Sequence, residues 1–66
     1  MHLTVNGVPR TIDRPLTVAD LVRELALEGK RIAVERNGEI VPRSRYAQTS
    51  IASGDRLEIV GAVGGG

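Results

Sequence analysis

The 66-residue sequence contains no cysteine, tryptophan or phenylalanine, and Tyr46 is its one aromatic residue of the Phe, Trp and Tyr set. Without cysteine the chain has neither a disulfide framework nor a thiolate metal site. A net charge of +1 and the lack of stacking rings argue against a nucleic-acid partner. No apolar run is long enough to span a bilayer, and no leader-like segment precedes residue 10. We therefore expect a cytoplasmic protein with no membrane partner.

Groups that could perform catalysis are equally sparse. His2 is the one imidazole, and no second histidine or cysteine could complete a metal site with it. The carboxylates of Asp20, Glu24 and Glu28 are spaced as on the solvated face of a helix. No serine has a base beside it in the sequence. We expect no catalytic residue, no metal site and no bound cofactor, so the chain is predicted not to be an enzyme.

The first residues predict a β-hairpin. Leu3 and Val5 alternate with polar residues, and residues 6–7 (Asn-Gly) favour a tight turn because both tolerate positive φ. A two-residue loop would pair Val5 with Val8. A four-residue loop would pair Val5 with Arg10 and leave Pro9 outside the ladder. Both registers place Leu3, Val5 and Ile12 on one face of the hairpin.

The next segment predicts an amphipathic helix. Thr17 and Asp20 have the spacing of a capping box, and Leu16 and Leu21 have that of a hydrophobic staple. The apolar stripe continues at helical spacing, and Gly29 offers a left-handed stop. Leu27 lies off the stripe and either closes the last turn or is exposed.

The remaining segments complete a recognisable order. Two extended segments flank residues 37–38 (Asn-Gly), one short helical turn carries Tyr46, and residues 56–60 alternate as a strand. One helix and one sheet bury each other's apolar faces in an α+β fold. The predicted architecture is the β-grasp, or ubiquitin-like, fold: a mixed sheet of four to five strands packed on one amphipathic helix. The domain is expected to cover residues 1–60.

Residues 61–66 (Gly-Ala-Val-Gly-Gly-Gly) form the expected tail. Glycines cannot bury side chains and lose the most backbone entropy on ordering, so we expect this tail to be flexible in the free protein. Fully extended, six residues reach about 20 Å, enough to enter a narrow channel of another protein. Terminal glycines also occur without any function. The expected attachment to a central strand favours a functional tail.

The whole chain resembles the ThiS family, the small sulfur carriers of thiamine biosynthesis. The most specific match is Asn-Gly-x-Ile-Val-Pro-Arg at residues 37–43. Further matches are Val-Asn-Gly at residues 5–7, Leu-Thr-Val-Ala-Asp-Leu at residues 16–21, and Gly-Asp-Arg-Leu-Glu-Ile-Val at residues 54–60. Two departures are mild: many relatives have tryptophan in place of Tyr46, and many end in two glycines rather than three.

The resemblance implies a pathway for the terminal carboxylate of Gly66. A partner resembling the E1-type adenylyltransferase ThiF would use ATP and Mg²⁺ to form a Gly66 acyl-adenylate. A persulfide on a sulfur-donor protein would then attack, leaving a thiocarboxylate, and the sulfur would pass to a thiazole synthase resembling ThiG. Gly64, Gly65 and Gly66 would occupy the partner's channel. The free carrier is expected to be a monomer.

A docking surface on the folded body is also expected, because a tail alone should bind weakly. Val60 is an apolar residue on the otherwise polar side of the last strand, so we place this surface around Val60, Arg56 and Glu58. Two other functions stay open. One is a carrier for another sulfur pathway, such as the MoaD-like small subunit of molybdopterin synthase. The other is a TGS-like module that binds RNA or a ligand with its body.

Overall fold

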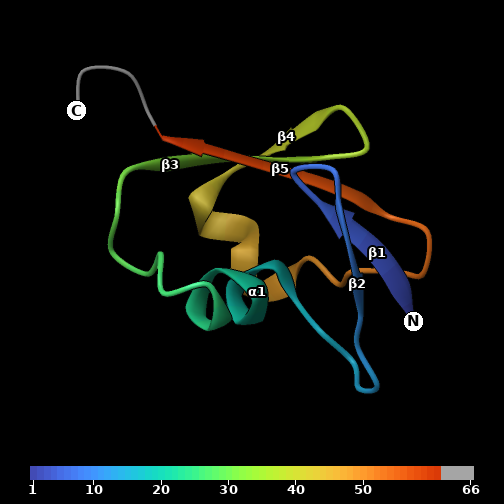
Figure 1. Cartoon of the computed structure of the whole chain (residues 1–66). Helices are drawn as coiled ribbons and strands as arrows, with labels where there is room; N and C mark the ends of the chain where they lie inside the picture. Colours follow the sequence, from blue (N-terminus) through green and yellow to red (C-terminus); the bar gives the residue numbers. More distant parts are fainter. Residues whose placement is uncertain (62–66) are drawn as a thin grey trace.

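A computed structural model describes residues 1–61, which form one mixed sheet packed against one α-helix and one 3-10 helix. The elements are β1 (His2–Val5), β2 (Val8–Thr11), α1 (Val18–Glu24), β3 (Ile32–Arg36), β4 (Glu39–Val41), η1 (Arg43–Gln48) and β5 (Arg56–Gly61). The five strands lie in the order β2-β1-β5-β3-β4. Both helices lie on the same side of the sheet (Figure 1). The predicted α+β, β-grasp architecture is confirmed.

The N-terminal hairpin has the two-residue loop. Val5 pairs with Val8, and Asn6 (φ 51°) and Gly7 (φ 79°) are both left-handed, as a type I′ turn requires. The alternative four-residue loop is therefore wrong. Pro9 lies within β2 opposite Thr4, and this is tolerated because β2 is an edge strand.

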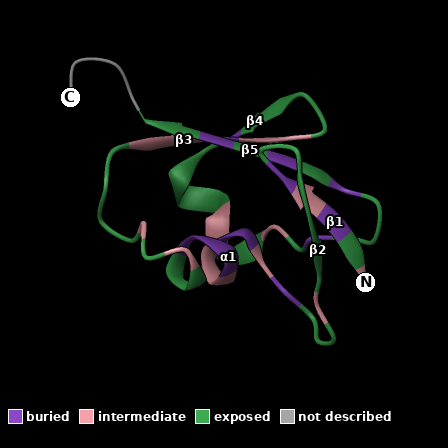
Figure 2. Ribbon diagram, in the orientation of Figure 1, coloured by how far each residue is buried: buried purple, intermediate pink, exposed green. Residues whose placement is uncertain are grey.

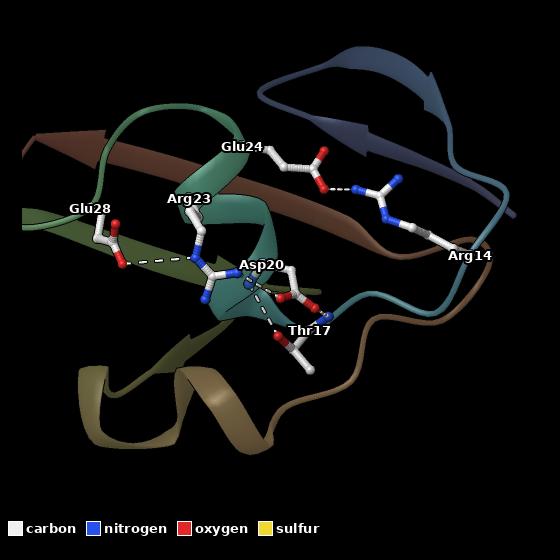
Figure 3. Close-up of polar contacts among 6 residues, drawn as sticks. All are labelled: Arg14, Thr17, Asp20, Arg23, Glu24 and Glu28. Carbon is white, nitrogen blue, oxygen red and sulfur yellow. Dashed lines mark hydrogen bonds and ion pairs between the residues drawn. The ribbon is translucent and has the colours of Figure 1, made fainter.

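The start of α1 follows the predicted capping box. The Thr17 hydroxyl accepts from the Asp20 N–H at 3.1 Å, and the Asp20 carboxylate accepts from the Thr17 N–H at 3.0 Å (Figure 3). These bonds lower the pKa of Asp20, the Thr17 N–H foremost, and Arg23 adds to the effect. Leu16 and Leu21 are both buried, as the staple predicts. The cap therefore fixes where the helix begins.

The helix ends earlier than predicted. Its C-cap is Leu25, and Ala26 adopts a left-handed φ of 59°. The Ala26 N–H donates to the Arg23 carbonyl and the Leu27 N–H to the Val22 carbonyl, both at 3.0 Å, which is a Schellman motif. The predicted stop at Gly29 is wrong, although Gly29 is also left-handed (φ 78°). Leu27 packs partly buried against the core, so it closes the last turn.

The core lies between α1 and the sheet (Figure 2). Leu57 on β5 and Val34 on β3 are fully buried, and Ile51 joins them from the segment after η1. Ile51 is held there because its N–H donates to the Leu16 carbonyl at 2.8 Å. Tyr46 packs partly buried at the edge of this core. The helix start, η1 and the sheet thus share one small apolar interior. Within residues 1–61, no helix has the length and apolar character needed to cross a membrane.

Candidate functional site

The last strand leads from the middle of the sheet toward the glycine segment. β5 pairs in parallel with β1 on one side and antiparallel with β3 on the other, which confirms its predicted central position. It ends at Gly61, opposite Ile32 and one residue beyond the predicted strand end. The predicted modified residue Gly66 and the predicted channel residues Gly64 and Gly65 lie outside the described residues. The described part of the site is therefore the body from which that segment departs.

The two faces of β5 divide as predicted. Leu57 and Ile59 face the core, whereas Arg56, Glu58 and Val60 are exposed on the face away from α1. Val60 has 58% of its surface exposed, a high value for a large apolar side chain. The three residues predicted for a docking surface thus share one accessible face.

The same outer face places two acidic residues opposite each other. Glu58 on β5 pairs with Glu35 on β3, and Ile40 on β4 is the next residue across. Like charges directly opposite on neighbouring strands are unfavourable. Ile40, beside Glu35, is 63% exposed, and Val60 lies two residues along β5 from Glu58, so two accessible apolar residues adjoin the acidic pair. We call Glu35, Ile40, Glu58 and Val60 the outer patch.

The surroundings of the strand end are basic. An open hollow there is lined by residues of four segments, among them Asn6, Leu27, Lys30, Arg31 and Val60. Lys30 and Arg31 come from the connection between α1 and β3, and both are exposed. The chain therefore leaves the sheet beside the positive charges of Lys30 and Arg31. The negative charge of Glu58 lies farther back along β5.

Two turn asparagines bind β5 through their side chains. The Asn6 Oδ1 accepts from the Ile59 N–H at 2.8 Å, and its Nδ2 donates to the Ile59 carbonyl at 3.0 Å. Asn37 Oδ1 accepts from the Arg56 N–H at 2.9 Å. From the sequence, both Asn-Gly pairs were interpreted only as turns. The only sign in the sequence of these side-chain bonds to β5 is the use of asparagine in both turns. This sign is weak, because asparagine is favoured in such turns without any further contact.

Asp55 is the one buried charged residue within residues 1–61. Its carboxylate accepts hydrogen bonds from the Ala52 N–H (2.8 Å), the Asn37 side chain (2.9 Å) and the Arg36 guanidinium (2.9 Å). Burial acts to raise the pKa of Asp55, but these bonds and the Arg36 charge outweigh it and lower the pKa below 3.8. Asp55 therefore joins the β3–β4 turn to the start of β5, a structural role that the sequence did not indicate.

His2 and the charged side chains outside the β5 region have ordinary contacts. His2 is exposed and its Nδ1 lies 3.2 Å from the Thr11 hydroxyl. Arg43 donates to the Lys30 carbonyl at 3.2 Å. Glu24 pairs with Arg14, and Arg23 lies between Asp20 and Glu28 (Figure 3). Among residues 1–61 no group of three or more His, Cys, Asp or Glu side chains is placed to hold a metal ion.

The geometry defines a ubiquitin-like β-grasp domain, with its chain leaving the central strand next to an exposed sheet face. The model of the ThiS family matches residues 3–66, and the chain belongs to this family. The crystal structure of the thiamine biosynthesis protein ThiS from Geobacter metallireducens superposes with a TM-score of 0.85 at 38% identity, with all of both chains covered.

Two curated relatives add to this picture. The sulfur carrier protein ThiS of Bacillus subtilis is 44% identical over 50 residues, which are 76% of either chain. A thiazole synthase of Paramagnetospirillum magneticum is 48% identical over all 66 residues of this chain. The chain spans 20% of the length of that relative. The resemblance deduced from residues 5–7, 16–21, 37–43 and 54–60 is confirmed.

Proposed function

We propose that this protein carries sulfur for thiamine biosynthesis as a thiocarboxylate on Gly66. Membership of the ThiS family is the observation that carries the proposal, and the Bacillus subtilis relative is named a sulfur carrier protein. The fold supports it, because the chain leads to its glycines from the centre of the sheet. In this role the protein is a substrate of its partners and not itself an enzyme. A cytoplasmic location stays a prediction.

The proposed chemistry begins with activation of the carboxylate. An α-carboxylate has a pKa of about 3.3–3.7, so at neutral pH it is an anion that resists nucleophilic attack. A ThiF-like adenylyltransferase would use ATP and Mg²⁺ to form the Gly66 acyl-adenylate and release pyrophosphate. The terminal sulfur of a persulfide on a donor protein would bond to the acyl carbon as AMP leaves. A thiol would then attack the donor's sulfur in this acyl disulfide, forming a new disulfide with the donor and releasing the thiocarboxylate.

A ThiG-like thiazole synthase is the proposed acceptor of the sulfur. Two proteins named thiazole synthase, from Paramagnetospirillum magneticum and Magnetococcus marinus, contain a region similar to the whole of this chain, at 48% and 32% identity. Joining a carrier to the enzyme that consumes its cargo raises their effective concentration. This arrangement in the two relatives supports a thiazole synthase as the partner of the chain described here.

The proposal is tested by the intact mass of the protein taken from its native cell. We expect a fraction that is heavier by the mass difference between sulfur and oxygen, and fragmentation should assign this gain to the peptide that contains Gly66. Purified protein incubated with ATP, Mg²⁺ and a ThiF-like enzyme should in addition gain AMP at the same peptide. Protein that gains neither group under these conditions would contradict the proposed function.

We further propose that the outer patch docks on the activating enzyme, together with Arg56. The unfavourable Glu35–Glu58 apposition is relieved if the partner places a cation between the two carboxylates. Exposed Val60 and Ile40, which adjoin the acidic pair, would supply apolar contact. We expect Val60→Asp to raise the KM of the activating enzyme for this protein, measured as pyrophosphate release, by about tenfold, because an apolar contact would be replaced by a carboxylate that loses its water on binding.

Val8→Asp is the matched control for this prediction. Val8 is 55% exposed, close to the 58% of Val60, but it lies on the edge strand β2. For Val8→Asp we expect the KM of the activating enzyme for the carrier to stay within about twofold of the wild-type value. An exposed charge on a remote surface should have little effect on docking or stability. Equal KM values for the two variants would show that the outer patch does not dock.

A further inference from the structure

Asn6 lies where the pairing between β1 and β5 would otherwise stop. The backbone ladder on this side of β5 runs from Thr4, whose N–H donates to the Asp55 carbonyl, to Asn6, whose N–H donates to the Leu57 carbonyl at 2.9 Å. A parallel ladder would continue with the Ile59 N–H donating to the backbone carbonyl of residue 6. The chain instead turns away at Asn6, with φ of 51°.

The Asn6 side chain takes over the bonds that the turning backbone gives up. Its Oδ1 accepts from the Ile59 N–H at 2.8 Å and its Nδ2 donates to the Ile59 carbonyl at 3.0 Å. One amide side chain therefore satisfies both backbone groups of Ile59. The neighbouring strand β3 cannot replace the Asn6 side chain. The N–H and C=O of one strand residue point to the same side, those of the next residue point to the other side, and those of Ile59 point away from β3. Ile59 is only 6% exposed, and losing Asn6 would remove the hydrogen-bond partners of both groups.

Asn37 makes a related contact at the other end of β5, where its side chain bonds one backbone group of the strand rather than two. It comes from the β3–β4 turn, has a φ of 53°, and accepts from the Arg56 N–H. The two turn asparagines thus hold β5 from opposite sides, one at the start of the strand and the other next to its end. Only Asn6 acts near the point of departure, because its partner Ile59 lies two residues before Gly61. Asn6 also lines the hollow that contains Lys30 and Arg31.

We propose that Asn6 is a positioning residue for the glycine segment: its two bonds to Ile59 fix the place and direction in which the chain leaves the sheet. This inference rests on the proposed carrier function. A partner that binds the outer patch and the Gly66 carboxylate at once must order the chain between them. If β5 separates from the sheet after Glu58, this free stretch becomes longer, and each added residue must be ordered on binding.

Asn6→Gly is the clean test, because glycine keeps the left-handed turn and removes only the amide. Asn37→Gly is the matched control: it removes the same kind of side chain from an equivalent turn residue at the remote end of β5. It also removes the bond from Asn37 to Asp55, so its loss of stability should be at least as large. Both variants are to be assayed well below their melting temperatures.

Two measurements decide the role. The first is amide hydrogen exchange of Ile59 relative to Ile51, whose N–H donates to Leu16 outside β5. We expect this ratio to rise at least about tenfold in Asn6→Gly and to change little in Asn37→Gly. The second is pyrophosphate release by a ThiF-like enzyme with ATP. We expect Asn6→Gly to raise the KM for the carrier about tenfold, with kcat within about twofold, because the lost order is restored in the complex.

A purely structural role would give a different pattern. If Asn6→Gly and Asn37→Gly change the KM equally, or if Ile59 exchange rises no more than Ile51 exchange, Asn6 does not position the segment. Failure of the carrier function itself is recognised separately, because the wild-type protein would then give no pyrophosphate in the same assay. In that case the proposed positioning role of Asn6 would be wrong as well.

Discussion

A chain that lacks Gly65 and Gly66 is expected to lose adenylation completely, while its melting temperature stays unchanged. Gly66→Leu is also expected to keep its melting temperature but to be activated at least about a hundredfold less well, because a side chain on the Cα displaces the neighbouring carboxylate from its line of attack on ATP. Every buried core residue within residues 1–61 precedes residue 60, so we expect the free energy of unfolding to change by no more than about 0.5 kcal/mol. ATP–pyrophosphate exchange and thermal unfolding measure the two effects.

Gly61→Ala is the appropriate control for the glycine variants. An added Cβ at Gly61 meets no atom within 4 Å, and its φ does not require glycine. We expect this variant to fold and to be activated like the wild type. Adenylation that persists without the terminal glycines would contradict a carrier function based on Gly66.

Asp55→Ala is expected to have the largest effect on stability. The substitution leaves the Ala52 N–H and the Arg36 guanidinium without their carboxylate, and Asp55 is only 6% exposed. Hydrogen bonds to a buried charge contribute more than neutral ones, so we expect a loss of about 2–4 kcal/mol in the free energy of unfolding. That is most of what a domain of this size has available. Urea unfolding measures the loss, and Asp13→Ala at an exposed position should change it by less than about 0.5 kcal/mol.

The lowered pKa of Asp55 also predicts how stability depends on pH. A carboxyl group whose pKa is lower in the folded state stabilises the fold above its ordinary pKa of 3.8, and this stabilisation is lost as the pH falls through the folded value. Asp20 acts in the same direction. We therefore expect wild-type stability to decrease below about pH 4 and the decrease to be smaller in Asp55→Asn. Parallel pH profiles for the two proteins would show that Asp55 does not carry this dependence.

Most of the fold could be predicted because its signals are local. The capping box of Thr17 and Asp20, the two Asn-Gly turns and the alternation of Leu57 and Ile59 each act within a few residues. The helix end was misplaced because alanine rarely takes the left-handed conformation that Ala26 adopts. Leu27, just after this turn, is packed against the core. This tertiary contact outweighs the preference of Gly29 for the left-handed conformation that ends a helix.

The site was predictable only where it depends on strand alternation. Val60, Arg56 and Glu58 follow directly from the period of two in β5. The Glu35–Glu58 apposition depends on the register between β3 and β5, which no local pattern specifies. The bonds of Asn6 to Ile59 and of Asp55 to Arg36 join residues 53 and 19 positions apart. Such contacts are set by the closed fold and not by the neighbouring sequence.

The central place of β5 has a consequence during synthesis on the ribosome. The hairpins β1–β2 and β3–β4 are made first, yet they become one sheet only when β5 is inserted between them. The nascent chain therefore cannot complete its interior before this last strand has emerged. An activating enzyme that recognises the assembled outer patch would thus not bind unfinished or misfolded chains. Sulfur loading would then be limited to molecules that have folded correctly.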